Sequence, residues 1–100
     1  MTAANIIAEQ LGGTRRLGMM IGAKDFVGGD KSLQFAVGRG AKDGINKIIV
    51  TLGADDTYTV EFGAYSPRKF EYAKKTSFSG VYADNLKSVI ESTTGFYLSL

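Results

Sequence analysis

Apolar residues recur every second position through the middle of the chain and every third or fourth position toward its two ends. Residues 2–11 are predicted to form a short helix, because apolar side chains repeat at four-residue spacing from Ala3 to Leu11 before a Gly-Gly pair. Residues 83–94 return to helical spacing, and Gly95 would stop that second helix. The pattern therefore predicts a β-rich centre with a helix at either end.

Five segments follow the two-residue period that is typical of strands with one buried face. They are residues 15–22, 32–37, 45–52, 57–64 and 69–78. Because the turns between them are short, consecutive strands are expected to pair as an antiparallel meander. We therefore predict an α+β fold in which both helices pack on the sheet, and a single domain over residues 1–100.

Composition narrows the class of function. The chain is 44% hydrophobic and 22% charged, as in ordinary globular domains, and it contains neither cysteine nor histidine. Thiol nucleophiles, the commonest metal ligand and the commonest general base are thus absent. We expect a binding protein with no catalytic residues, no cofactor and no metal. The chain also lacks a long apolar run and a typical signal peptide, so we expect it in the cytoplasm.

Positive charge is concentrated in one short segment. The net charge is +2, and residues 1–66 balance seven cations with seven anions, whereas residues 67–80 carry a local charge of +3. A local excess of this kind marks either a binding surface or a solvated strand edge. Its cations are Arg68, Lys69, Lys74 and Lys75.

Aromatic residues lie among these cations, within residues 66–78. Single-stranded nucleic acid binds to surfaces that combine positive charge for the phosphates with aromatic faces for the bases. The four cations named above are the candidate phosphate contacts, and Tyr65 and Tyr72 are the candidate stacking residues. The sequence therefore predicts a non-catalytic protein that binds single-stranded nucleic acid through this segment.

Strict alternation along the same segment favours a plainer interpretation, an outer strand with its aromatic residues in the core and its lysines in water. In a regular strand the predicted inner face holds Phe70, Tyr72, Lys74, Thr76 and Phe78. The opposite face would hold Lys69, Glu71, Ala73, Lys75 and Ser77. Most aromatic residues and most cations would then lie on different faces, and both interpretations stay open from sequence alone.

Segments spread over most of the chain resemble a group of small, uncharacterised proteins encoded by phages and prophages. They are Leu11-Gly12-Gly13, residues 22–26 (GAKDF), residues 56–62 (DTYTVEF), residues 80–83 (GVYA) and residues 94–100 (TGFYLSL). This resemblance implies a host cytoplasm, with phage DNA metabolism or interference with the host as the broad roles. The predicted order of strands followed by a helix also resembles the single-strand-binding domain of certain transcriptional coactivators.

The carboxyl-terminal tail supports an alternative function. Phe96, Leu98 and Leu100 alternate with less apolar residues, and such a tail would be adhesive if it were left free. We expect it to dock on the sheet or to form a subunit interface, which predicts a homo-oligomer. The alternative is therefore a protein-interaction module that binds or inhibits a host factor, or a structural homo-oligomer.

Overall fold

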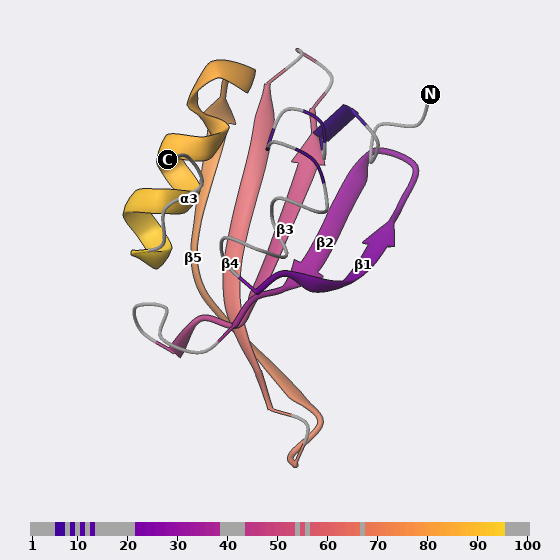
Figure 1. Ribbon diagram of the computed structural model, residues 1–100, viewed down its shortest axis with the longest axis vertical. Coiled ribbons are helices and arrows are strands. Elements are labelled where there is room, and N and C mark those ends of the chain that lie inside the picture. Colours follow the sequence, from indigo (N-terminus) through magenta and orange to yellow (C-terminus); the bar gives the residue numbers. More distant parts are fainter. Residues whose placement is uncertain are drawn as a thin grey trace.

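The computed structural model describes residues 6, 7, 9, 11, 13, 22–38, 44–53, 55, 57–66 and 68–95. Their main feature is one antiparallel sheet with the strand order β1-β2-β3-β4-β5 (Figure 1). The strands are β1 (Lys24–Gly28), β2 (Ser32–Ala36), β3 (Lys47–Leu52), β4 (Tyr58–Ser66) and β5 (Glu71–Val81). A 3₁₀ turn, η2 (Ala83–Asn85), leads into the helix α3 (Leu86–Thr94).

The predicted antiparallel meander and carboxyl-terminal helix are confirmed. The first strand differs from the prediction, because the strand beside β2 is β1, which the periodicity left unassigned. The strand predicted over residues 15–22 lies outside the described residues except for Gly22. The helix predicted over residues 2–11 also lies largely outside them.

The tail residues predicted to form an interface, Phe96, Leu98 and Leu100, lie outside the described residues as well. Of the amino-terminal segment, Ile7 and Leu11 are described, and both are fully buried in the hydrophobic core. The backbone N–H of Leu11 donates a hydrogen bond of 3.1 Å to the carbonyl of Ile7. Ile7 and Leu11 thus contribute to the core.

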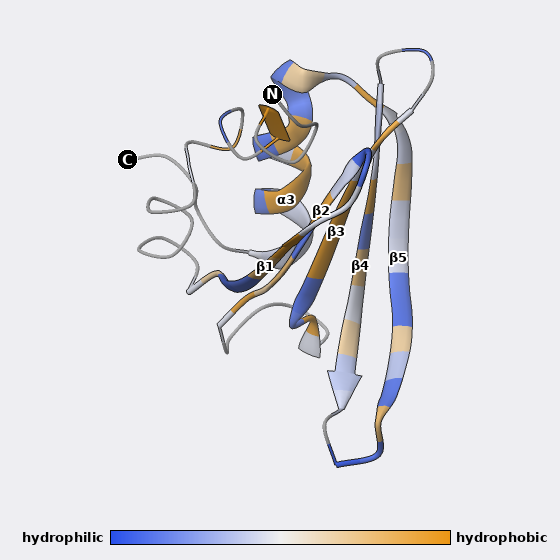
Figure 2. Ribbon diagram, turned by 90° about the vertical axis from the view of Figure 1, so that its right-hand side faces the viewer, coloured by the Kyte–Doolittle hydropathy of each residue, from blue (hydrophilic) through white to orange (hydrophobic). Residues whose placement is uncertain are grey.

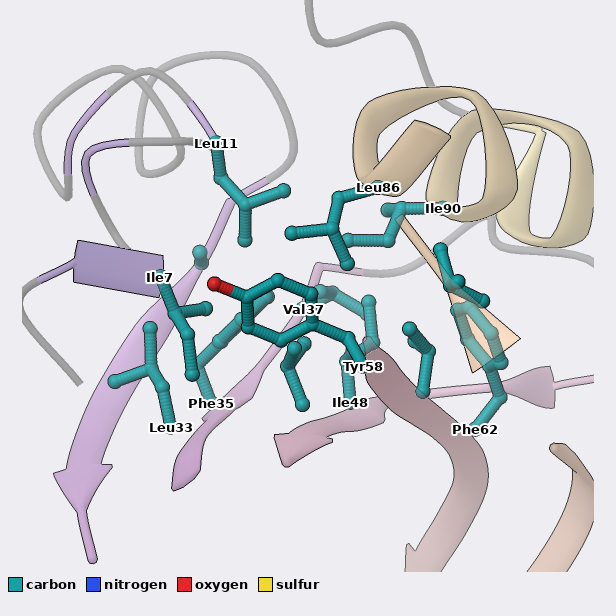
Figure 3. Packing of buried hydrophobic residues seen from close by; sticks show 14 of the residues in the cluster. Ile7, Leu11, Leu33, Phe35, Val37, Ile48, Tyr58, Phe62, Leu86 and Ile90 are labelled. Atoms are coloured by element: carbon teal, nitrogen blue, oxygen red, sulfur yellow. The ribbon is translucent and has the colours of Figure 1, made fainter. Parts of the chain in front are cut away.

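The core lies against one face of the sheet, called here the inner face. Strand register aligns inner-face residues in rows, with Phe35 opposite Ile48 and Ile48 opposite Phe62. Leu86 and Ile90 of α3 pack on the same cluster, as Figure 3 shows. Figure 2 shows α3 on this side of the sheet. Because burial of apolar area is the main favourable term in folding, this face stabilises the domain.

Helix α3 ends where the sequence predicts. Gly95 adopts a left-handed conformation with φ of 82°, and its N–H donates a 2.8 Å hydrogen bond to the carbonyl of Glu91. Glycine is the residue that accepts this conformation most readily, because it has no Cβ. The buried Thr94 hydroxyl donates to the carbonyl of Ile90 at 2.6 Å, so this polar group enters the core with a partner.

The turn between β3 and β4 is held by local hydrogen bonds. The N–H of Gly53 donates to the carbonyl of Thr57 at 2.7 Å, and the Thr57 hydroxyl donates to Asp55 Oδ1 at 2.6 Å. This hydroxyl, followed by the Thr57 backbone N–H, lowers the pKa of Asp55. The adjacent strands are thereby joined in register.

Among the described residues, no helix has the length and apolar character needed to cross a membrane.

Candidate nucleic-acid interface

The hairpin formed by β4 and β5 is longer than the strands beside it. Pairing between β3 and β4 reaches Lys47 opposite Gly63, whereas pairing between β4 and β5 continues to Ser66 opposite Glu71. Residues 64–66 and 68–73 therefore form a two-stranded hairpin arm that projects beyond the other strands (Figures 1 and 2).

The tip of the hairpin arm is basic and aromatic. Arg68, Lys69 and Phe70 are all exposed, and Phe70 has 83% of its surface accessible to solvent. Phe70 also has a φ of 52°, in the left-handed region that bulky side chains rarely adopt. Such a conformation costs on the order of 1–3 kcal/mol. The turn therefore holds a large aromatic side chain in water at an energetic cost.

A bulge in β5 changes which residues lie on the open face. Phe62 pairs with Thr76, but the next residue of β4, Gly63, pairs with Lys74, so Lys75 is an extra residue in β5. A one-residue insertion of this kind reverses the alternation beyond it. Tyr72 consequently lies opposite Tyr65 rather than among the inner-face residues.

The strict alternation considered from the sequence is therefore wrong for Tyr72 and Lys74. Both lie on the outer face, the side of the sheet opposite the core, whereas Thr76 and Phe78 lie on the inner face as predicted. Phe78 packs edge-on against Phe62, with ring centroids 6.2 Å apart. The bulge thus brings Tyr72 and Lys74 to the same face as Tyr65. The sequence pattern alone had placed them on the opposite face.

Tyr65, Tyr72 and Lys47 form a compact group on the outer face, called here the tyrosine platform. Tyr65 and Tyr72 are directly paired across β4 and β5, and each exposes 37% of its surface. The Nζ of Lys47 lies 5.6 Å from the centroid of the Tyr65 ring and 6.0 Å from that of the Tyr72 ring. These distances fall within cation–π range, so one cation joins both rings.

Two residues of β4 orient the Tyr72 ring. Its hydroxyl donates a 2.7 Å hydrogen bond to Glu61 Oε2. The ring crosses Gly63 so closely that a Cβ at that position would clash with it. Partial burial of the side chain, together with the Glu61 carboxylate, raises the pKa of Tyr72. The phenol therefore stays protonated and fixed at neutral pH.

Asn46 holds the base of the hairpin arm in place. Its side-chain Nδ2 donates to the carbonyl of Tyr65 at 2.9 Å, and its Oδ1 accepts the N–H of Tyr65 at 2.7 Å. Its backbone N–H donates to the carbonyl of Gly63 at 3.0 Å. An amide side chain thus extends the ladder by one residue pair beyond the end of β3 and fixes the position of the Tyr65 backbone.

The structure places the predicted site residues of the hairpin at three locations. Tyr65, Tyr72 and Lys74 lie on the outer face, and Lys74 pairs with Gly63, the residue that the Tyr72 ring covers. Arg68 and Lys69 lie at the exposed tip. Lys75 occupies the bulge between the arm and the body of the sheet and is exposed.

Four residues of the site were missed from the sequence: Asn46, Lys47, Glu61 and Gly63. They belong to strands or turns whose composition gives no sign of a site, and pairing with neighbouring strands is what brings them to the tyrosines. The described residues contain no group of three or more acidic, cysteine or histidine side chains that could hold a metal ion.

Comparisons with models of known protein families, with curated proteins and with solved structures give no match. Function is therefore inferred from the site itself: two exposed tyrosines, Lys74 and a basic tip on one hairpin, with Lys47 of the neighbouring strand β3 beside the tyrosines.

Proposed function

We propose that the protein binds single-stranded nucleic acid on the tyrosine platform and along the hairpin arm, without catalysis. The observation that carries the proposal is the pairing of two half-exposed tyrosine rings, Tyr65 and Tyr72, beneath the amine of Lys47. Bases stack on such rings irrespective of their identity, because every base has a π-face. The expected binding tolerates different sequences.

The cations around the rings support phosphate contacts. Lys47 and Lys74 lie on either side of Gly63 in one cross-strand row, directly beside the pair of tyrosines. A strand that stacks on the rings would therefore have an amine within reach on both sides. Binding that neutralises phosphates releases counterions, so affinity should fall steeply as salt concentration rises.

Glu61 gives the platform a direction. Its carboxylate accepts a hydrogen bond from the Tyr72 hydroxyl and would repel a phosphate placed at that end of the ring. Phosphates are then expected on the side of the lysines and toward Arg68 and Lys69 at the tip. The backbone of the bound strand would run along the hairpin arm, away from Glu61.

Titration of a fluorescent single-stranded oligonucleotide at low salt tests the role of the rings. Y65A should weaken binding by about 1–3 kcal/mol, the usual loss of one stacked base. Y82A is the matched control, because Tyr82 is also an exposed tyrosine, 64% accessible, but lies beyond β5 and outside the platform. It should bind like the natural protein. Equal losses in Y65A and Y82A, or no binding at tens of micromolar protein, would reject the proposal.

Charge reversal tests the phosphate contacts independently of the rings. K74E should weaken binding and reduce its dependence on salt, since one phosphate contact is removed and one repulsion is added. K31E makes the same change at an exposed lysine in the turn between β1 and β2, away from the arm. If K31E weakens binding as much as K74E, overall charge rather than this site explains the binding. Capture of a host protein that survives nuclease treatment would favour the interaction module instead.

A further inference from the structure

A second feature of the outer face is a pocket that adjoins the tyrosine platform. Its volume is about 580 Å³, within the usual range for sites that hold small molecules. It lies against β1, β2 and the start of β3, and Tyr65 and Lys47 contribute to both the pocket and the platform. Its lining includes Lys24, Val27, Gln34, Asn46, Lys47 and Tyr65.

A bulge in β1 places two residues of that strand at the pocket. Lys24 pairs with Ala36 and Val27 pairs with Gln34, so β1 has one more residue than β2 between these pairs. Asp25, within this bulge, has a φ of 56°, and Phe26 packs on the core residue Phe35 with centroids 5.5 Å apart. Lys24 and Val27 therefore both lie on the outer face. Bulges that redirect side chains in this way are common beside binding sites.

The pocket offers the groups that a nucleotide requires. The Tyr65 ring and the Val27 side chain provide flat and aliphatic surface for a base, while Lys24 and Lys47 carry positive charge for a phosphate. Asp25 is the acidic residue among the described lining residues, so the two lysines leave a positive excess.

Gln34 distinguishes this pocket from a simple basic hollow. Among the described residues its side-chain amide has no hydrogen-bond partner, although it lines the pocket. The neighbouring Asn46 amide, by contrast, is bonded to both backbone groups of Tyr65. A free glutamine amide donates and accepts at once, and it pairs in that way with the N6 and N7 edge of adenine.

We infer that this pocket binds one adenine nucleotide of the strand that stacks on the platform. Gln34 pairs with the base, Tyr65 and Val27 enclose it, and Lys24 with Lys47 contacts its phosphate. This inference rests on the proposed function, which it extends from a sequence-tolerant surface to one selective position. Lys47 lies where the two parts meet, because it lines the pocket and also lies near both tyrosine rings.

Titration of the protein with adenosine 5′-monophosphate, followed by NMR chemical shifts, tests the pocket without an oligonucleotide. Adenosine monophosphate should bind in the millimolar range and roughly tenfold more tightly than the cytidine, guanosine or uridine monophosphates. V27W should abolish this binding, because the larger side chain fills the pocket. T59W is the matched control, since Thr59 is likewise an exposed strand residue but does not line the pocket.

K24Q adds a second measurement that does not depend on filling the pocket. It should weaken the binding of adenosine monophosphate severalfold and leave the binding of adenosine, which has no phosphate, unchanged. Equal weakening of both ligands would overturn the phosphate contact, and equal binding of all four monophosphates would overturn the role of Gln34. Circular dichroism of each variant establishes that the fold is retained.

The same variants separate this inference from the proposed function. If oligonucleotides bind and depend on Tyr65, but no monophosphate binds at millimolar concentration and V27W binds adenine-containing strands normally, the pocket inference alone is wrong. If adenosine monophosphate binds and V27W abolishes this binding, but no oligonucleotide binds, the platform proposal fails and the pocket is a site for a free adenine nucleotide rather than for one within a strand.

Discussion

The two ends of the β4–β5 hairpin differ in whether their aromatic side chains are buried in the core or exposed to solvent. At the body end, Phe62 of β4 is fully buried, contacts Phe78 of β5 and belongs to the core that α3 covers. At the arm end, Tyr65 and Tyr72 are direct register partners, whereas Phe62 and Phe78 contact each other diagonally, and both tyrosine rings remain half-exposed. Cross-strand aromatic contacts therefore stabilise the fold at one end of the hairpin and leave two tyrosine rings accessible to solvent at the other.

The difference between the ends arises from what lies beside the strands. The body end has β3 on one side and the helix over its inner face, whereas the arm extends past Lys47, where β3 begins. A two-stranded hairpin alone is marginally stable in water, so the arm depends on the body that anchors it. Asn46, bonded to the Tyr65 backbone, is the residue that joins the two.

The largest expected contrast is between F62A and Y65A. Removing the buried Phe62 side chain should lower the free energy of unfolding by about 3–5 kcal/mol, because it leaves a cavity in the core. Y65A should cost far less stability while it weakens oligonucleotide binding. Urea unfolding of both variants measures the contrast, and a loss in Y65A as large as that in F62A would show that the arm is part of the core.

A smaller effect is expected where the two ends meet. G63A should destabilise the protein by about 1–3 kcal/mol, because the new Cβ collides with the Tyr72 ring. The double variant G63A/Y72A removes the obstacle and should recover part of this loss. If G63A is as stable as the natural protein and binds oligonucleotides equally well, the Tyr72 ring does not lie across Gly63 in solution.

The smallest effect is expected for Y72F, which removes the hydrogen bond to Glu61 and should cost about 1 kcal/mol at neutral pH. The pKa of Tyr72 is raised in the folded protein, so its contribution is complete below the ordinary tyrosine pKa near 10 and declines as pH rises above that value. The stability difference between the natural protein and Y72F should therefore shrink in alkaline solution. A stability difference that grows with pH would contradict the hydrogen bond between Tyr72 and Glu61.

Alternation sufficed to predict β2, β3 and β4, because each strand has one buried face. In β4, for example, the predicted arrangement is found: Val60 and Phe62 point inward, and Thr59 and Glu61 point outward. The end of α3 was equally predictable from Gly95, whose left-handed conformation follows from the chemistry of that residue.

The outer-face site could be predicted in composition but not in geometry. The cluster of cations and tyrosines is visible in the sequence, whereas the bulge at Lys75 carries no glycine or other local sign. Lys47 joins the tyrosines through the register of β3 on β4, which depends on packing across the whole sheet. Long-range pairing of this kind is not encoded in any short stretch of residues.

The extra residue at Lys75 has a consequence for how related chains should be compared. If the same residues of β5 paired with β4 without this bulge, Lys75 would lie opposite Gly63, and Tyr72 and Lys74 would turn to the other side of the sheet. A relative with a gap of one position at Lys75 would instead have a regular β5 and would keep Tyr72 and Lys74 on the outer face. The register of β5 on β4, as much as the composition of β5, is therefore the feature to compare.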